Sequence, residues 1–150
     1  MTHPIIESIV GDVSQGAKRF FVHSLLPTLN EYTKASRGNK YASAGMKRKA
    51  EEFIMWEIRS QLKNWTTERP VFLLFRWVER DMRRDHDNVA FAKKFVQDAL
   101  VKSGVIRGDG WKHVTGFVDL FAVDKKNPGV EVYILEVCDD QERTKAVRRP

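Results

Sequence analysis

The chain has 150 residues, of which 42% are hydrophobic and 31% charged, proportions typical of one soluble globular domain. No apolar stretch approaches the roughly 20 residues that a membrane-spanning helix requires. The N-terminus lacks the basic start and apolar core of a signal peptide. The single cysteine, Cys138, excludes an internal disulfide framework and a zinc site built from several cysteines. We therefore expect a cytoplasmic protein.

The net charge of +6 is concentrated in one part of the chain. Residues 18–63 contain 10 basic and 4 acidic residues, so this segment alone accounts for the whole surplus. A basic surface favours a polyanionic partner, because cationic side chains that neutralise phosphates release condensed counterions. The charge distribution favours nucleic acid as a partner, with a merely solvated basic face as the other interpretation.

The first half of the chain predicts one strand and two helices. Residues 1–17 lack a clear period and are expected to form a flexible leader. Aromatic and branched residues at 19–25 predict a strand, and residues 28–36 predict a short helix. Ser43 is a suitable N-cap for a long helix that ends at Leu62. Its apolar stripe is expected in the core and comprises Met46, Ala50, Phe53, Ile54, Ile58 and Leu62.

Two basic segments adjoin this long helix. Residues 37–41 contain Gly and Asn between cations, which predicts a loop that is either a solvated turn or a phosphate contact. The run Lys47-Arg-Lys49 is expected near the start of the helix, where the helix dipole disfavours cations. An anionic partner would offset that cost, although a solvated face is the simpler interpretation.

The second half predicts three more strands and one helix. The nearly continuous apolar run 71–78 predicts a central strand. A helix is expected from Asp87 or Asn88 to about Lys102, and Gly104 just after it is the residue that stops it. Strands at 111–123 and 130–137 flank a predicted hairpin turn at 124–129, and residues 139–150 form a charged tail that we expect to be disordered. This order predicts an α+β domain over residues 18–138, with helices packed on a mixed sheet of about four strands.

The segment that follows the central strand carries two carboxylates, Asp85 and Asp87. If the backbone is still extended there, both side chains point to the same side, and His86 between them points to the other. Two hard oxygen ligands suit magnesium, which binds through one or two carboxylates and keeps other positions for water and phosphate. A solvated turn with a helix cap is the alternative interpretation of so short a motif. The spacings of Lys93, Lys94, Asp98 and Asp109 allow these residues to fold back to the same place.

Several motifs together resemble the RusA family of Holliday junction resolvases. They are Arg84-Asp-His-Asp-Asn88, Lys94-Phe-Val-Gln-Asp-Ala-Leu100, Gly104-Val-Ile106 and Asp109. Family members read Arg-Asp-x-Asp-Asn, a Lys-x-x-x-Asp-Ala-Leu helix, a Gly-hydrophobic pair and an Asp-Asp pair. The segment Leu26-Pro-Thr-Leu-Asn-Glu-Tyr32 resembles the opening loop of the family. Three later segments look like its phage and prophage branch, namely Asp109-Gly-Trp-Lys112, Asp124-Lys-Lys-Asn-Pro128 and Val130-Glu-Val132. The resemblance covers roughly residues 20–136.

The resemblance implies a homodimeric endonuclease, dependent on Mg²⁺ or Mn²⁺, that resolves four-way DNA junctions by paired symmetric cuts in recombination, repair or phage DNA processing. It implies that Asp85, Asp87 and Asp109 bind metal and that Lys94 is the essential lysine. Asp98 and Asn88 would hold these residues in place without binding the metal themselves. The residues expected to contact DNA are Arg37, Lys40, Lys47, Arg48, Lys49 and Arg84.

This chain departs from the family pattern in two places. The spacing from Asp87 to Asp98 is about one helical turn longer than in the best-known members, so Lys93 could take the place of Lys94. The acidic pair is Gly108-Asp109 here, and we take Asp109 as the ligand. Two other functions stay open: a non-catalytic protein that binds branched DNA, and a different magnesium nuclease that cuts flaps or single strands.

Overall fold

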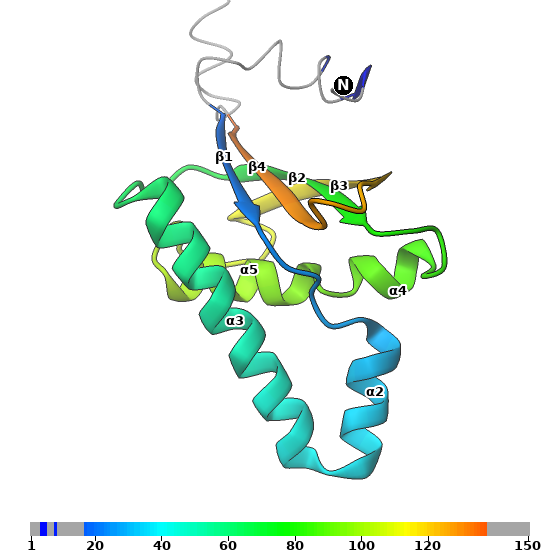
Figure 1. The fold of residues 1–150 in the computed structure, drawn as a ribbon. Coiled ribbons are helices and arrows are strands. Elements are labelled where there is room, and N and C mark those ends of the chain that lie inside the picture. Colours follow the sequence, from blue (N-terminus) through cyan, green and yellow to red (C-terminus); the bar gives the residue numbers. More distant parts are fainter. Residues whose placement is uncertain (1–3, 6–7, 9–16, 138–150) are drawn as a thin grey trace, which may run out of the picture.

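Four strands form one mixed sheet, with the helices of the domain on one side of it (Figure 1). The computed structural model describes residues 4–5, 8 and 17–137, so most of the expected leader and the expected tail at 139–150 lie outside the described residues. The sheet has the order β1-β4-β2-β3, and the expected α+β class is confirmed. The elements are β1 (Lys18–Val22), α2 (Leu29–Gly38), α3 (Lys40–Leu62), β2 (Val71–Glu79), α4 (His86–Ala90), α5 (Lys93–Lys102), β3 (Val114–Val123) and β4 (Gly129–Glu136).

The predicted hairpin between the last two strands is wrong. Strand β2 lies between β3 and β4, parallel to β3 and antiparallel to β4. Residues 124–128 therefore cross the end of β2, where the Asp124 amide donates to the Glu79 carbonyl at 2.9 Å. The turn itself forms as predicted, because Asp124 Oδ1 accepts from the amide of Lys126 at 3.0 Å. The apolar faces of β2 account for its insertion, since a strand buried on both faces belongs at the centre of a sheet.

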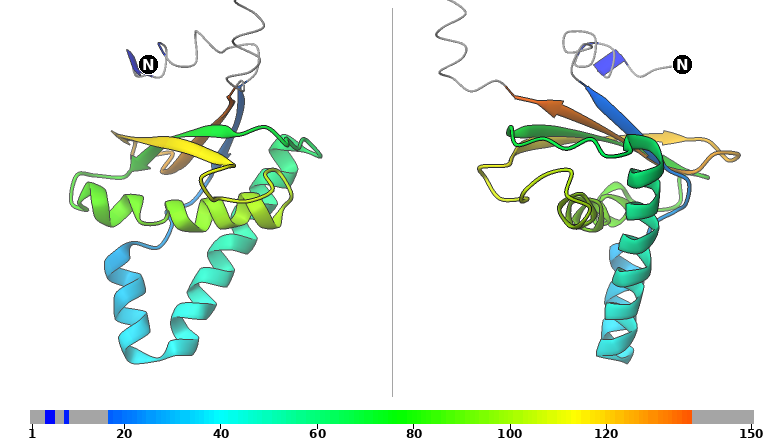
Figure 2. Two further views of the ribbon diagram at one scale, coloured as in Figure 1. Left: turned by 180° about the vertical axis from the view of Figure 1, so that it is seen from behind. Right: turned by 90° about the vertical axis from the view of Figure 1, so that its left-hand side faces the viewer.

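The core lies between the sheet and helices α3 and α5 (Figure 2). Alternate residues of β2, namely Leu73, Phe75 and Trp77, point to this side and are buried. Ile54 and Ile58 of α3 are also buried there, as the helical spacing predicts. Phe53 of the predicted stripe is 38% exposed, because its position lies on the rim of the apolar face.

Helices α2 and α3 form a hairpin whose tip projects away from the sheet (Figures 1 and 2). The predicted loop at 37–41 is wrong, because only Asn39 separates the two helices. Asn39 has an extended backbone, ends α2 and caps α3 by accepting from the Tyr41 amide at 2.8 Å. Ser43 is therefore not the N-cap but lies buried in the first turn of α3. The run 47–49 lies two turns inside α3, so the dipole argument does not apply to it.

The predicted helix after the acidic motif is broken into two. Helix α4 ends at Ala90, and α5 begins at Lys93. The C-terminus follows the prediction: Gly104 has a φ of 81°, and the amides of Gly104 and Val105 donate to the carbonyls of Val101 and Leu100, both at 3.0 Å. None of the helices in the described part of the chain has the length and apolarity needed to cross a bilayer.

Candidate functional site

Asp85 and Asp87 occupy the turn that leads from β2 into α4. Asp85 is the N-cap residue of α4, with φ −65° and ψ 151°, and its side chain makes no capping hydrogen bond. Asp87 is already helical, and its Oδ1 accepts from the Asn88 amide at 2.9 Å. The expectation of an extended backbone through Asp87 is therefore wrong, so the alternation argument does not hold. Both carboxylates are nevertheless exposed.

Lys94 brings together two carboxylates from different parts of the motif. Its Nζ donates to Asp98 Oδ1 at 3.0 Å, one turn further along α5, and to Asp109 Oδ2 at 3.3 Å in the loop before β3. The hydrogen bond to Asp98 raises the pKa of Lys94, and the bond to Asp109 adds to that effect. The structure thus places Lys94, Asp98 and Asp109 at one point, although they are separated in sequence.

Lys47 of α3 extends this cluster. Its Nζ lies 3.2 Å from Asp98 Oδ2 and 3.6 Å from Glu51 Oε1. Glu51 is 3% exposed and also forms an ion pair with Lys102 near the end of α5. Cations and carboxylates therefore alternate from Lys102 through Glu51, Lys47, Asp98 and Lys94 to Asp109. Each charge is stabilised by two neighbours of opposite sign, except at the ends.

A second lysine points to the sheet instead. Lys93 forms an ion pair with Asp119 of β3 and lies 3.9 Å from the centroid of the Phe117 ring. The other Asp119 oxygen accepts from the Trp77 indole at 2.9 Å. This contact of Asp119 was not identified from the sequence. The period-2 position of Asp119 between Phe117 and Phe121 is the signal that would have placed it on the inner face.

Two other residues of the motif make structural contacts. Asn88 Oδ1 accepts from the amide of Asn30 at 2.9 Å, which satisfies a free N–H group in the first turn of α2. Arg84 lies 3.4 Å from Glu79 Oε2 and donates to the Leu26 carbonyl at 3.4 Å. These contacts attach the acidic turn to the segment before α2 and to the end of β2.

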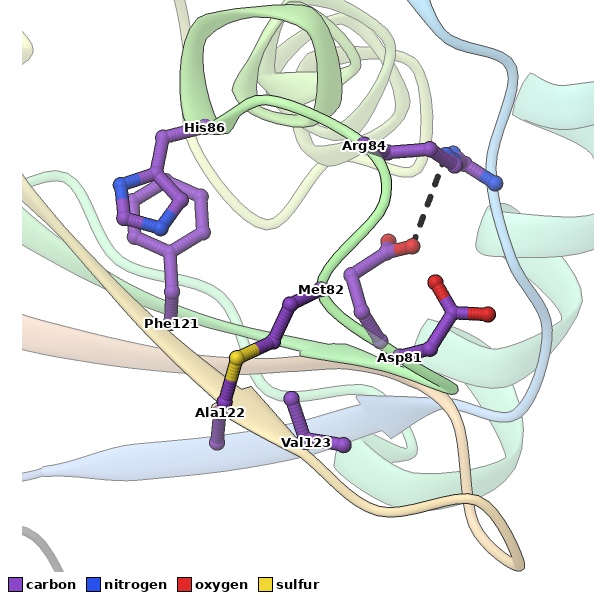
Figure 3. Close-up of a pocket in the computed structure, with 8 residues that line it drawn as sticks. Asp81, Met82, Arg84, His86, Phe121, Ala122 and Val123 are labelled. Carbon is purple, nitrogen blue, oxygen red and sulfur yellow. Dashed lines mark ion pairs between the residues drawn. The ribbon is translucent and has the colours of Figure 1, made fainter.

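An apolar pocket of about 370 Å³ adjoins the same turn (Figure 3). Its wall includes His86, which stacks on Phe121 with ring centroids 3.9 Å apart, and Met82, which is 90% exposed. Figure 3 shows the ion pair of Arg84 with Glu79 on the opposite side of the view from His86. The ring of His86 is therefore packed against β3.

The residues expected to contact DNA divide into two groups. Arg37, Lys40, Arg48 and Lys49 are exposed on the hairpin of α2 and α3. Lys47 and Arg84 instead form the ion pairs described above. The exposed cations of the projecting hairpin can contact phosphates without breaking an ion pair within the described residues.

The donor set of the acidic turn fits a hard cation, because Asp85 and Asp87 supply exposed carboxylate oxygens two residues apart. Asp109, the third expected ligand, is bound by Lys94. Among residues 4–5, 8 and 17–137, no three histidine, cysteine, aspartate or glutamate side chains lie together as a metal-binding group. Comparison with family models and with curated proteins finds no match to this chain.

Proposed function

We propose that this protein is a magnesium-dependent, structure-specific DNA endonuclease that resolves four-way junctions by paired symmetric cleavage. The contact of Lys94 with both Asp98 and Asp109 carries the proposal. It joins the lysine, the helix aspartate and the loop aspartate of the motif that resembles the RusA family. A helix pattern alone accounts for the Lys94–Asp98 pair, but not for the arrival of Asp109 from the following loop.

Asp85 and Asp87 would hold the metal ion. Asp109 would join them after leaving Lys94 and moving toward the turn, because the three carboxylates do not form one group among the described residues. Bound there, magnesium would polarise a phosphoryl oxygen and activate the attacking water. Manganese has the same preference for carboxylate oxygen and could replace it. The exposure of the two turn aspartates supports this role, since their oxygens are open to both an ion and a phosphate.

Lys94 would stabilise the negative charge that grows on the phosphate as the bond breaks. Its side chain is 60% exposed, so substrate can reach it. Asp98 would hold the ammonium in place, and Lys47 would in turn hold Asp98. The exposed cations of the α2–α3 hairpin would follow the DNA arms through their phosphates, which recognises shape more than sequence. A homodimer would carry two such sites related by a two-fold axis, which matches the two-fold symmetry of a four-way junction.

The test is cleavage of a mobile four-way junction, a linear duplex and a flap substrate, each with Mg²⁺ and with EDTA. Paired symmetric nicks in the junction alone, dependent on metal, are the expected result. Tight binding of the junction without cleavage would replace the proposal with a branched-DNA binding protein. Equal cutting of all three substrates, or preferred cutting of the flap, would replace it with another magnesium nuclease.

A further inference from the structure

Trp111 lies two residues beyond Asp109, and its side chain is 99% exposed. Its ring makes no aromatic or cation–π contact with the described residues. One exposed apolar side chain is ordinary, but neighbouring exposed apolar side chains rimmed by polar groups mark binding surfaces, and Phe117, 48% exposed, lines the same pocket as Trp111. Tryptophan in particular offers a flat surface for stacking.

A pocket of about 280 Å³ opens beside Trp111, between α5 and the start of β3. Asp109, Gln97 and Phe117 are among the residues that line it. Phe117 is 48% exposed, and Lys93 lies against its ring. The pocket thus combines aromatic walls with one amide side chain, next to the carboxylate that we assign to the cleavage centre.

We propose that this pocket binds an unpaired nucleobase next to the scissile phosphate, with Trp111 and Phe117 as stacking surfaces. The proposal rests on the proposed function, because it takes Asp109 as the position of the phosphate. Bases that leave the duplex stack on aromatic side chains and are recognised by hydrogen bonds along their edges. The Gln97 amide can both donate and accept such bonds, and it has no hydrogen bond to the described residues.

The size and charge of the site favour a nucleobase over a protein partner. Its volume lies just below the range of pockets for drug-sized ligands, so it suits a single planar ring system. Lys93 and Lys94 flank it, and the chain carries a net charge of +6, which favours a ligand that brings phosphates. At the crossover of a branched junction the continuous stacking of the duplex is interrupted, so a base there can leave its pair at a lower cost than inside a duplex.

The test measures binding of a labelled single-stranded oligothymidylate to the full chain in EDTA by fluorescence anisotropy, so no cleavage is required. Trp111→Ala should weaken binding by about tenfold, whereas Trp111→Phe should stay within about threefold of the wild type. Trp56→Ala is the matched control, because Trp56 is also exposed but lies on α3 outside the pocket. Its affinity should remain close to that of the wild type.

Equal affinity of the Trp111→Ala variant and the wild type would overturn the proposal, as would an equal loss in Trp56→Ala. A change of the Trp111→Ala variant from dimer to monomer in light scattering would assign Trp111 to an interface between copies and also overturn it. The junction assay distinguishes this inference from the proposed function. If binding depends on Trp111 but the junction is not cleaved, the proposal of a base-binding pocket stands and the proposed resolvase function is wrong.

Discussion

The Lys47 ammonium lies 3.2 Å from Oδ2 of Asp98, and this contact connects the long helix α3 to the helix that carries Lys94. Asp98 therefore uses one oxygen for each lysine. Burial alone would raise the pKa of Asp98, but the hydrogen bonds from Lys94 and Lys47 outweigh it and lower that pKa. Lys47, which the sequence analysis expected to contact DNA, therefore forms an internal ion pair with a residue next to the candidate site.

Replacing Lys47 should separate this internal role from a phosphate contact. Lys47→Gln should lower the free energy of unfolding, because it removes the ion pair with Asp98. The loss should be only roughly 0.5–1 kcal/mol, because solvent partly screens that pair. It should also slow junction cleavage at saturating DNA, since Asp98 would hold Lys94 less firmly. Lys49→Gln is the matched control: it removes an exposed charge two positions away and should weaken DNA binding without changing stability. Identical behaviour of the two variants would contradict the positioning role.

Replacing each of the two adjacent lysines of α5 should affect a different property: cleavage for Lys94 and stability for Lys93. Lys94→Met should reduce cleavage by about a hundredfold or more while the unfolding transition stays in place, because the side chain is 60% exposed. Lys93→Met should lower the free energy of unfolding by roughly 1–3 kcal/mol, since it leaves Asp119 without its ion partner. Urea denaturation and junction cleavage, measured on both variants, check the assignment. Full cleavage by Lys94→Met would move the catalytic role to Lys93.

Neutral replacements of the three aspartates test the metal ligands. Asp85→Asn, Asp87→Asn and Asp109→Asn should each reduce cleavage by about a thousandfold or more, because the metal contributes several kcal/mol to the transition state. Junction binding in a gel-shift assay should persist, since the phosphate contacts come from other residues. Asp81→Asn, in the same turn, is the control and should cleave normally. Cleavage retained by Asp87→Asn would remove the metal-site assignment.

Local patterns were sufficient for much of the fold. The apolar run at 71–78 identified the central strand, and the helical spacing of Ile54 and Ile58 identified the buried face of α3. Gly104 identified a helix end because a left-handed φ there favours glycine. In each case the information lies within a few residues of the element that it determines.

The errors arise where distant residues decide the outcome. The turn at Asp124 has hairpin chemistry, yet β2 inserts between the two strands that it joins. The break at residues 91–92 contains no glycine or proline, and the apolar spacing continues through it. The same limit applies to the site. The contacts of Lys47 with Asp98 and of Lys93 with Asp119 depend on how α3, α5 and β3 pack, which no local period encodes.

Glu131, on the face of the sheet away from the helices, should make the stability of the protein depend on pH in the acid range. Glu131 of β4 is 5% exposed, accepts from Arg19 at 3.1 Å and lies 3.8 Å from Arg76. Burial alone would raise the pKa of Glu131, but the hydrogen bond from Arg19 and the charge of Arg76 help to lower it below its ordinary value of 4.5. A carboxylate with a lowered folded-state pKa stabilises the protein above its unfolded-state pKa. That contribution disappears as the pH falls through the folded-state pKa.

Glu131→Gln should therefore lower the free energy of unfolding at about pH 7 by roughly 1–3 kcal/mol, because it removes a charged hydrogen bond. The difference from the wild type should shrink steadily below about pH 4.5, where the wild-type carboxylate also becomes neutral. Urea denaturation across this range is the measurement, and Glu52→Gln, at an exposed position of α3, is the control. A difference that stays constant with pH would mean that shape, and not charge, makes Glu131 stabilising.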